Sequence, residues 1–244
     1  MTATTRWPAT PEELEALQHD LASRQPPPWT PLTPIAAVGG CFVCFARGKV
    51  GRGRAGDLGW AGASLLSGGE VVETAAVAGP AGAPYEPGLL ALREGPLMEA
   101  AVRRLRERPE VLLVNATGRD HPRQAGLALH LGAVLDVPTV GVTMRPLVAE
   151  GALPAGEVRA VSPLLLGGNV VGYWVRTRRD AHPIAVHAAW RTDAATALVV
   201  VLALAGRART PEPIRQARRA AREARAAAPR VRSRLSFGEA KSPL

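Results

Sequence analysis

The chain has 244 residues, 47% of them hydrophobic and 21% charged, which is typical of one large globular domain and excludes a disordered chain. Its longest apolar run, residues 194–206, is shorter than the roughly 20 residues that a membrane-spanning helix needs. The first residues lack the basic and then apolar pattern of a secretory signal, so we expect a cytoplasmic protein with no membrane partner.

The net charge of +9 is concentrated in one segment. Residues 207–234 contain ten arginines and two glutamates, which accounts for +8 of the total. The chain has 28 Arg and only 2 Lys; a GC-rich genome explains that preference but not the clustering. A concentrated arginine segment attracts phosphate backbones, which favours a nucleic-acid partner. A solvated helix and tail is the alternative interpretation.

The first thirty residues predict a helix followed by a linker. Residues 10–13, Thr-Pro-Glu-Glu, place an N-cap before a proline and two glutamates, so we expect a helix that runs to about residue 23. Three prolines at 26–28 then favour an extended segment.

Three strands are predicted next, at residues 35–45, 61–66 and 70–76. A basic, glycine-rich loop at 48–59 separates the first two. The Ser-Gly-Gly sequence at 67–69 is typical of a hairpin turn between the last two. We therefore expect the three strands to be antiparallel.

The rest of the chain alternates helices with short apolar strands. Helices are predicted at residues 89–108, 124–135, 192–205 and 213–227, and strands at 111–114, 138–142, 170–178 and 184–187. A helix between two short buried strands implies parallel pairing with a right-handed crossover. One domain is thus expected over residues 31–228, with a helix and linker at 1–30 and a flexible basic tail at 229–244.

Cys41 and Cys44 form a C-x-x-C pattern, which occurs in redox pairs and zinc sites. Positions three apart on a strand point to opposite faces, and the chain has no second cysteine pair. Two buried core residues are therefore the preferred interpretation.

Two sequence blocks in the middle of the chain carry a recognisable pattern. Residues 85–94 read YEPGLLALRE, and residues 115–123 read NATGRDHPR. Together with residues 35–45 and the Pro-Glu-Pro-x-Arg start of the last helix, they resemble the endonuclease V family over about residues 35–220. The resemblance implies an α/β, ribonuclease H-like fold, a mixed sheet of three antiparallel strands followed by parallel βαβ units and flanked by helices.

The resemblance also implies a DNA-repair nuclease that needs Mg²⁺ and cuts 3′ to deoxyinosine or inosine. Mg²⁺ held by oxygen ligands activates water and stabilises the transition state of phosphodiester hydrolysis. Glu94, in the first block, matches a family metal ligand. Four other implied site positions carry different residues, with Phe42 and Asn115 in place of aspartates, Met144 in place of a catalytic lysine and Trp190 in place of a metal-site histidine.

His121 is retained from the second block, and two roles are open for it: assistance at the metal site, or a hydrogen bond to the loop backbone. Asp193 also agrees with the family, but an N-cap explains it equally well. The loss of two carboxylates costs a Mg²⁺ site several powers of ten in affinity. Asn115 still offers a neutral oxygen, and Asp120 is a candidate substitute ligand.

Tyr85 and Pro87 match a family wedge that parts stacked bases, although Glu86 between them repels phosphate. An ordinary turn before a helix is the alternative. The same resemblance assigns nucleic-acid contacts to Gly118, Arg123 and Arg215.

The sequence therefore predicts an endonuclease V-like protein that binds DNA or RNA, with catalysis and Mg²⁺ binding weakened or lost, in other words a pseudo-enzyme. One alternative is an active inosine-directed endonuclease with a metal site rearranged around Glu94 and Asp120. Another is an interaction protein that binds a protein partner and no nucleic acid.

Overall fold

The structure, a computed structural model, describes residues 7–31, 34–48, 51–206 and 208–229. It contains the predicted N-terminal helix, α1 (Pro11–Ser23), in which the Thr10 side chain accepts a hydrogen bond from the Glu13 backbone N–H. Apart from Pro229, the predicted tail at 229–244 lies outside the described residues.

In these residues, eight strands form one mixed sheet. Their bounds are β1 Ala37–Phe45, β2 Leu58–Ser67, β3 Glu70–Pro80, β4 Val111–Val114, β5 Thr139–Thr143, β6 Val161–Leu166, β7 Asn169–Val175 and β8 Ile184–Ala188. The order is β3-β2-β1-β4-β5-β8-β7-β6. β4 is parallel to both β1 and β5, and the other pairs are antiparallel. The predicted start, three antiparallel strands and then a parallel βαβ unit, is confirmed.

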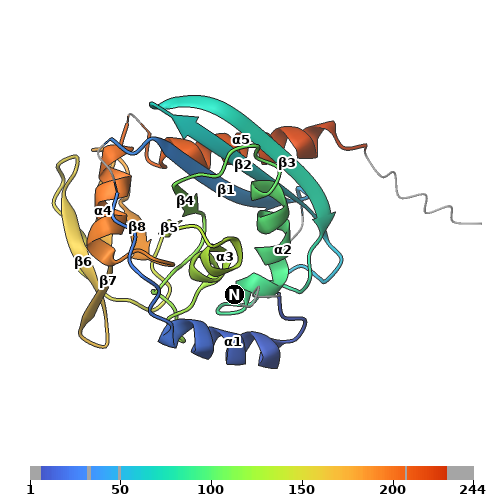
Figure 1. The fold of residues 1–244 in the computed structure, drawn as a ribbon, viewed down its shortest axis with the longest axis horizontal. Coiled ribbons are helices and arrows are strands. Elements are labelled where there is room, and N and C mark those ends of the chain that lie inside the picture. The colour runs from blue at the N-terminus through green and yellow to red at the C-terminus, as the bar shows by residue number, and fades with distance from the viewer. Residues whose placement is uncertain (1–6, 32–33, 49–50, 207, 230–244) are drawn as a thin grey trace, which may run out of the picture.

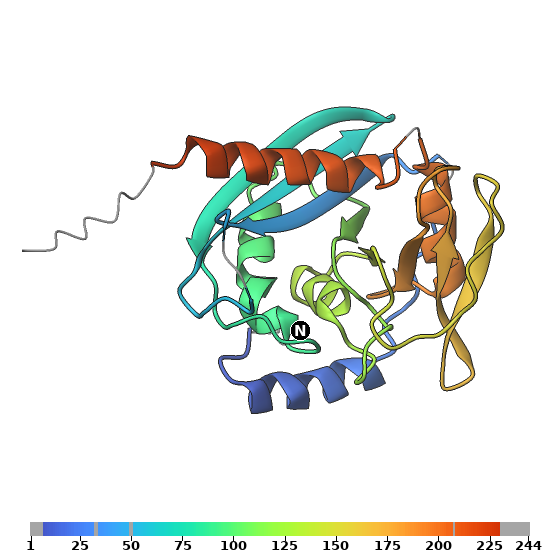
Figure 2. The same cartoon turned by 180° about the vertical axis from the view of Figure 1, so that it is seen from behind.

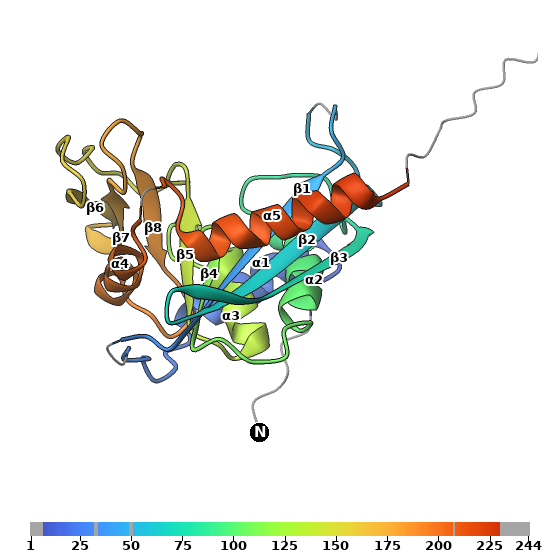
Figure 3. The same cartoon turned by 90° about the horizontal axis from the view of Figure 1, so that it is seen from above.

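Helices cover both faces of the sheet. They are α2 (Leu90–Val102), α3 (Leu127–Leu135), α4 (Ala194–Ala203) and α5 (Glu212–Ala227), in addition to α1. α5 crosses β1, β2 and β3 on one face, whereas α2 and α3 lie on the other face with α1 outside them (Figures 1 and 2). Seen from above, α5 runs along β1 and β2 at one end of the sheet, and α4 packs beside β7 and β8 at the other (Figure 3).

The two faces of β1 pack against different helices. Cys41 and Val43 belong to a core cluster shared with α2 and α3. Cys44 belongs to a smaller cluster with Ala221 of α5, and Phe42 packs against that cluster. Cys41 and Cys44 therefore point to opposite faces, as predicted, and both are buried, free thiols.

α5 approaches the sheet closely because Gly40 and Gly62 carry no side chain. A Cβ atom at Gly40 would lie 2.3 Å from the Pro213 backbone, and one at Gly62 would lie 2.1 Å from the Ala217 carbonyl oxygen. The Ser64 hydroxyl donates to the Pro213 carbonyl at 2.7 Å. These contacts fix the position of α5 over β1 and β2.

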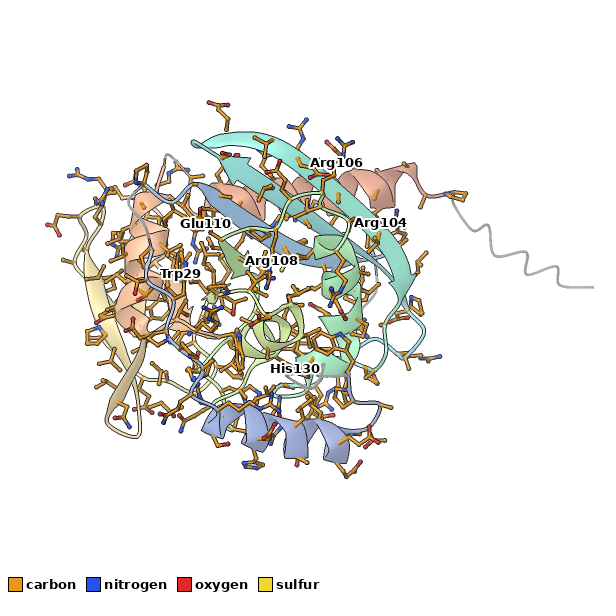
Figure 4. All side chains as sticks on the ribbon, in the orientation of Figure 1. Trp29, Arg104, Arg106, Arg108, Glu110 and His130 are labelled. Atoms are coloured by element: carbon orange, nitrogen blue, oxygen red, sulfur yellow. The ribbon has the colours of Figure 1, made fainter. Side chains whose placement is uncertain are left out.

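The proline-rich segment after α1 joins the domain through Trp29. Its backbone N–H donates to the Arg191 carbonyl at 2.8 Å, and its ring packs against the cluster between the sheet and α4. Figure 4 shows Trp29 on the segment that passes α4. The segment is therefore part of the domain surface and does not act as a free linker.

Several bounds shift by a few residues, and two elements differ more from the predictions. α2 ends at Val102, not near residue 108, because the chain tightens into i to i−3 hydrogen bonds that turn Leu105 into the core. β6 was not predicted: it contains Pro163, and Leu164 is its one fully buried residue, so it lacks a regular apolar pattern. None of the helices in the described segments is long and apolar enough to span a membrane.

Candidate nucleic-acid and metal site

A cleft of about 380 Å³ opens at the carboxyl ends of β4 and β5. Residues 85–88 before α2, residues 115–117 after β4 and residues 143–147 after β5 line it. Ligands of open α/β sheets commonly bind at the carboxyl ends of the parallel strands. Four predicted site residues, Tyr85, Pro87, Asn115 and Met144, meet there.

The turn before α2 is held in one conformation. The Tyr85 backbone N–H donates to the Arg52 carbonyl at 2.6 Å, and Gly88 adopts a φ of +83°, where a side chain would be strained. Tyr85 is 46% exposed. Its side chain is thus available at the cleft surface, as a wedge would require, although an ordinary rigid turn has the same geometry.

The Gly88 carbonyl oxygen is the meeting point of three side chains. Gln18 donates to it at 3.0 Å, Arg123 donates at 3.4 Å, and His121 Nε2 lies 3.1 Å away. His121 Nδ1 accepts from the Arg123 backbone N–H, which leaves Nε2 to donate to Gly88. Burial lowers the pKa of His121 to about 4, so the ring is neutral near pH 7. Of the two roles predicted for His121, the structure places it in the backbone-bonding one.

Two residues predicted to contact nucleic acid have other partners. The Arg123 guanidinium donates to the Gln18 amide oxygen at 2.6 Å and lies 3.3 Å from Glu15, so it ties α1 to the turn. At Gly118 a Cβ atom would lie 2.1 Å from the Ala188 carbonyl oxygen, which makes this glycine a packing requirement. Neither residue lines the cleft.

Phe42 and Asn115 occupy neighbouring positions at the centre of the sheet. Cys41 pairs with Val114 in parallel register, and the Asn115 backbone N–H donates to the Cys41 carbonyl at 3.3 Å. Phe42 and Asn115 therefore each follow the last registered pair of these two adjacent strands. The two positions at which the resemblance implies aspartates do lie together, but they hold a ring and an amide.

Glu94 lies close to β1 from the α2 side. Burial, and then the charge of Glu94, raises the pKa of the Cys41 thiol. Desolvation raises the pKa of Glu94 itself to about 7, against the opposing effect of the neighbouring Arg93. Arg93 is engaged elsewhere, with donations to the Ala83 carbonyl at 2.6 Å and to Asp57 at 3.3 Å. The Glu94 side chain is partly exposed but does not line the cleft.

Asp120 is not available as a substitute ligand, which corrects that prediction. Its buried carboxylate accepts hydrogen bonds from the backbone N–H groups of Leu147, Val148 and Ala149 at 2.6, 2.9 and 2.7 Å. It also lies 3.5 Å from His187 Nδ1. Asp120 thus supports the loop that lines the cleft.

Trp190 is also corrected, because it lies at the opposite end of β5 from the cleft. Its backbone N–H donates to the Thr139 hydroxyl at 3.1 Å, and its carbonyl accepts from the Thr139 N–H. The side chain packs beside Gly132 of α3, where a Cβ atom would lie 2.4 Å from that of Trp190. In contrast, Asp193 has the predicted N-cap role and accepts from the Thr196 N–H at 2.7 Å.

The residues present do not fit the metal that the resemblance implies. Mg²⁺ prefers several oxygen ligands, with carboxylates among them. Across the described part of the chain, no group of three or more His, Cys, Asp or Glu side chains is placed to hold a metal ion. Of the acids that the resemblance implies as metal ligands, the chain retains Glu94.

A residue that sequence reasoning missed reaches Phe42 from α5. The Arg218 guanidinium lies over the Phe42 ring, 4.9 Å from its centre. In the sequence Arg218 is one of many arginines in a basic helix, and nothing in the local pattern separates it from its neighbours. Its contact is with a strand near the other end of the chain, so only the fold brings the two residues together.

Helices on both faces of a mixed sheet, with a cleft beside its central parallel strands, define a ribonuclease H-like protein. A family model for Endonuclease V matches residues 29–219. The chain belongs to the endonuclease V family.

Named relatives agree with this assignment. An Endonuclease V from Myxococcus xanthus is 36% identical over 225 residues, which cover 88% of this chain and 89% of that protein. The crystal structure of the Endonuclease V from Streptomyces avermitilis is similar with a TM-score of 0.79 and 34% identity, covering 90% of this chain and 95% of that one. A Ciona intestinalis Endonuclease V, in complex with a 24mer DNA containing an inosine, shares the fold with a TM-score of 0.73 and 20% identity over 88% of this chain and 97% of that one.

Proposed function

We propose that this protein binds nucleic acid on the endonuclease V frame and has weak or no metal-dependent nuclease activity. The observation that carries the proposal is the pair Phe42 and Asn115, which puts an aromatic ring and an amide where the resemblance implies two carboxylates. A cytoplasmic location is part of the proposal.

Nucleic-acid binding is supported by family membership and by the charge of the chain. The Ciona relative binds an inosine-containing DNA, and deoxyinosine or inosine is the base that we propose for this chain too. Tyr85 and Pro87 border the cleft and suit a wedge against stacked bases. DNA and RNA are both candidate substrates.

Weak catalysis follows from electrostatics. Two carboxylates lost from a Mg²⁺ site remove favourable interactions of about 4 kcal/mol each at 4 Å and an effective dielectric of 20, before desolvation. Asn115 retains a neutral oxygen, but Phe42 offers none. Asp120 does not compensate, because three backbone N–H groups already occupy its carboxylate.

A second candidate function is an active endonuclease that uses Glu94. The observation that favours it is the pKa of Glu94, raised by burial to about 7, which suits a group that exchanges protons near neutral pH.

One assay separates the two functions. The protein is incubated with a deoxyinosine-containing duplex, or an inosine-containing RNA, and Mg²⁺ or Mn²⁺. We expect binding without nicking. Nicking by the wild type that disappears in Glu94→Gln would establish the second function and overturn the first. Glu110→Gln is the matched control. Glu110 directly precedes β4, at the opposite end of that strand from the cleft.

A further inference from the structure

One side of α5 carries a groove of about 420 Å³ lined mainly by arginines. Its lining consists of Arg215, Arg218, Arg219, Arg222, Glu223 and Ala226. We call these residues the arginine groove. The four arginines are spaced three, one and three residues apart, so they share one face of the helix.

The charges of the arginine groove are only partly neutralised. Arg215 pairs with Glu212, and Arg219 pairs with Glu223 at 2.8 Å. For Arg218 and Arg222, no carboxylate of the described residues lies within ion-pair distance. Burial, and then repulsion from Arg222 and Arg215, lowers the pKa of Arg218. An anion in the groove would relieve this repulsion.

Arg218 links the arginine groove to the altered metal site. Its guanidinium lies over Phe42, which follows Cys41, and the Cys41 carbonyl accepts from the Asn115 backbone N–H. Stacking on a ring uses the flat face of a guanidinium and leaves the N–H groups at its rim for hydrogen bonds. The Nε atom of Arg218 is buried and has no partner among the described residues. A protein side chain thus supplies positive charge beside Phe42, one of the two positions that lack carboxylates.

We propose that the arginine groove is a binding site for the phosphodiester backbone of nucleic acid that needs no metal ion, with Arg218 as the resident cation. The proposal rests on the proposed function and deepens it. A site built from carboxylates binds a cation and through it a phosphate. Here the ring of Phe42 and the guanidinium of Arg218 reverse the local charge, so phosphate is bound directly.

The length of the groove favours a polynucleotide over a small anion. Arg215 and Arg222 are two helical turns apart, about 10 Å at 1.5 Å per residue. One strand carries a charge about every 3.4 Å along a duplex axis, so the groove matches roughly three phosphates. α5 lies on the outside of the sheet, and no other described helix covers it (Figures 2 and 3).

The test compares two double variants of the full chain. Arg218→Met with Arg222→Met removes both unpaired charges and keeps an apolar stem over Phe42. Arg104→Met with Arg106→Met removes the same charge from the turn after α2, the helix on the opposite face of the sheet from α5 (Figures 1 and 2). Binding of a labelled duplex and a labelled single strand is measured by fluorescence anisotropy from about 50 to 200 mM salt, with EDTA or with Mg²⁺. Thermal unfolding verifies that both variants are folded.

We expect the groove variant to bind about tenfold to hundredfold more weakly and to show a log–log salt slope for the duplex reduced by about 1.8, equivalent to two phosphate contacts. The control variant should bind within about twofold of the wild type, and EDTA should have no effect. Equal losses of affinity in the two variants, or no loss in either, would show that the arginine groove is not the binding site. The proposal that the protein binds nucleic acid would still stand. If EDTA abolished binding, the proposal that Arg218 replaces a metal ion at this site would be wrong. A wild type that fails to bind at low salt would remove the proposed function as well.

Discussion

The carboxylate of Asp120 lies 3.5 Å from His187 Nδ1, and neither side chain is exposed to solvent. On the other side of the ring, His187 Nε2 lies 2.8 Å from the Thr143 hydroxyl, which is at the end of β5 and lines the cleft. Burial lowers the pKa of His187 to about 4, although Asp120 opposes this. The contact is therefore between a carboxylate and a neutral ring near pH 7. It joins β8 to the loop after β4.

The first prediction concerns the role of Asp120. Asp120→Ala removes the acceptor for three backbone N–H groups and should lower the free energy of unfolding by about 3–5 kcal/mol. Urea unfolding measures the change. Asp180→Ala, at an exposed position, is the matched control and should change it by less than about 0.5 kcal/mol. If Asp120→Ala were equally mild, Asp120 would have to be reconsidered as a ligand.

The second prediction concerns the tether between α1 and the turn at the cleft. Gln18→Ala removes a buried hydrogen bond to Gly88 and the partner of Arg123. The free energy of local opening of residues 85–89 should fall by about 1–3 kcal/mol, which raises their amide exchange rates roughly tenfold to hundredfold. Hydrogen exchange followed by mass spectrometry measures this. Gln25→Ala, at an exposed position after α1, should leave exchange unchanged, and an equal effect in both variants would contradict the tether.

The third prediction is a pH dependence that arises from His130. This ring is fully buried against Trp7, 4.2 Å between centroids, and neither nitrogen has a partner among the described residues. Burial lowers its pKa from 6.5 to about 4. Between these values the unfolded chain binds a proton that the folded ring does not. The stability due to neutral His130 is therefore present above pH 6.5 and is lost as the pH falls toward 4.

His130→Leu should remove this dependence. The plot of unfolding free energy against pH should become shallower by up to about 1.4 kcal/mol per pH unit inside that window. The variant should also be more stable at neutral pH, because two unpaired buried nitrogen atoms are removed. Urea unfolding at a series of pH values measures both effects. Parallel curves for the two proteins would show that the ring is not the titrating group.

The fourth prediction concerns restoration of a metal site. Phe42→Asp with Asn115→Asp should not be sufficient, because Arg218 would pair with the new carboxylate at position 42. Adding Arg218→Ala should strengthen Mn²⁺ binding at least tenfold, since it removes a positive charge beside the cation. Isothermal titration calorimetry measures the affinities. Adding Glu94→Gln to the triple variant should weaken Mn²⁺ again, and no change there would place the ion elsewhere.

Local patterns predicted most of the fold. The apolar runs of β1, β4 and β5, the Ser-Gly-Gly turn and the Thr10 cap each carry their own signal, and each is present in the structure. The edge strand β6 was missed because one face is exposed and a proline interrupts it. The end of α2 was misplaced because burial of Leu105, not helix propensity, decides it.

The site was less predictable, because its decisive contacts join distant segments. The resemblance implied neighbouring positions for Phe42 and Asn115, and the structure has one on β1 and the other directly after the adjacent β4. It put Trp190 in the wrong place, because matching short motifs does not reveal which end of a strand they reach. The backbone N–H groups of residues 147–149 donate to Asp120, and Arg218 lies over Phe42. No local sequence pattern predicts either contact.

The glycine contacts beneath α5 also bear on biosynthesis. Ser64 bonds to Pro213, a residue 149 positions later in the chain. During translation the surface of β1 and β2 that receives α5 must stay uncovered until that helix emerges from the ribosome. A nascent chain with an open apolar sheet is prone to aggregate. Expression yield should therefore depend on chaperone capacity more strongly than the stability of the finished protein suggests.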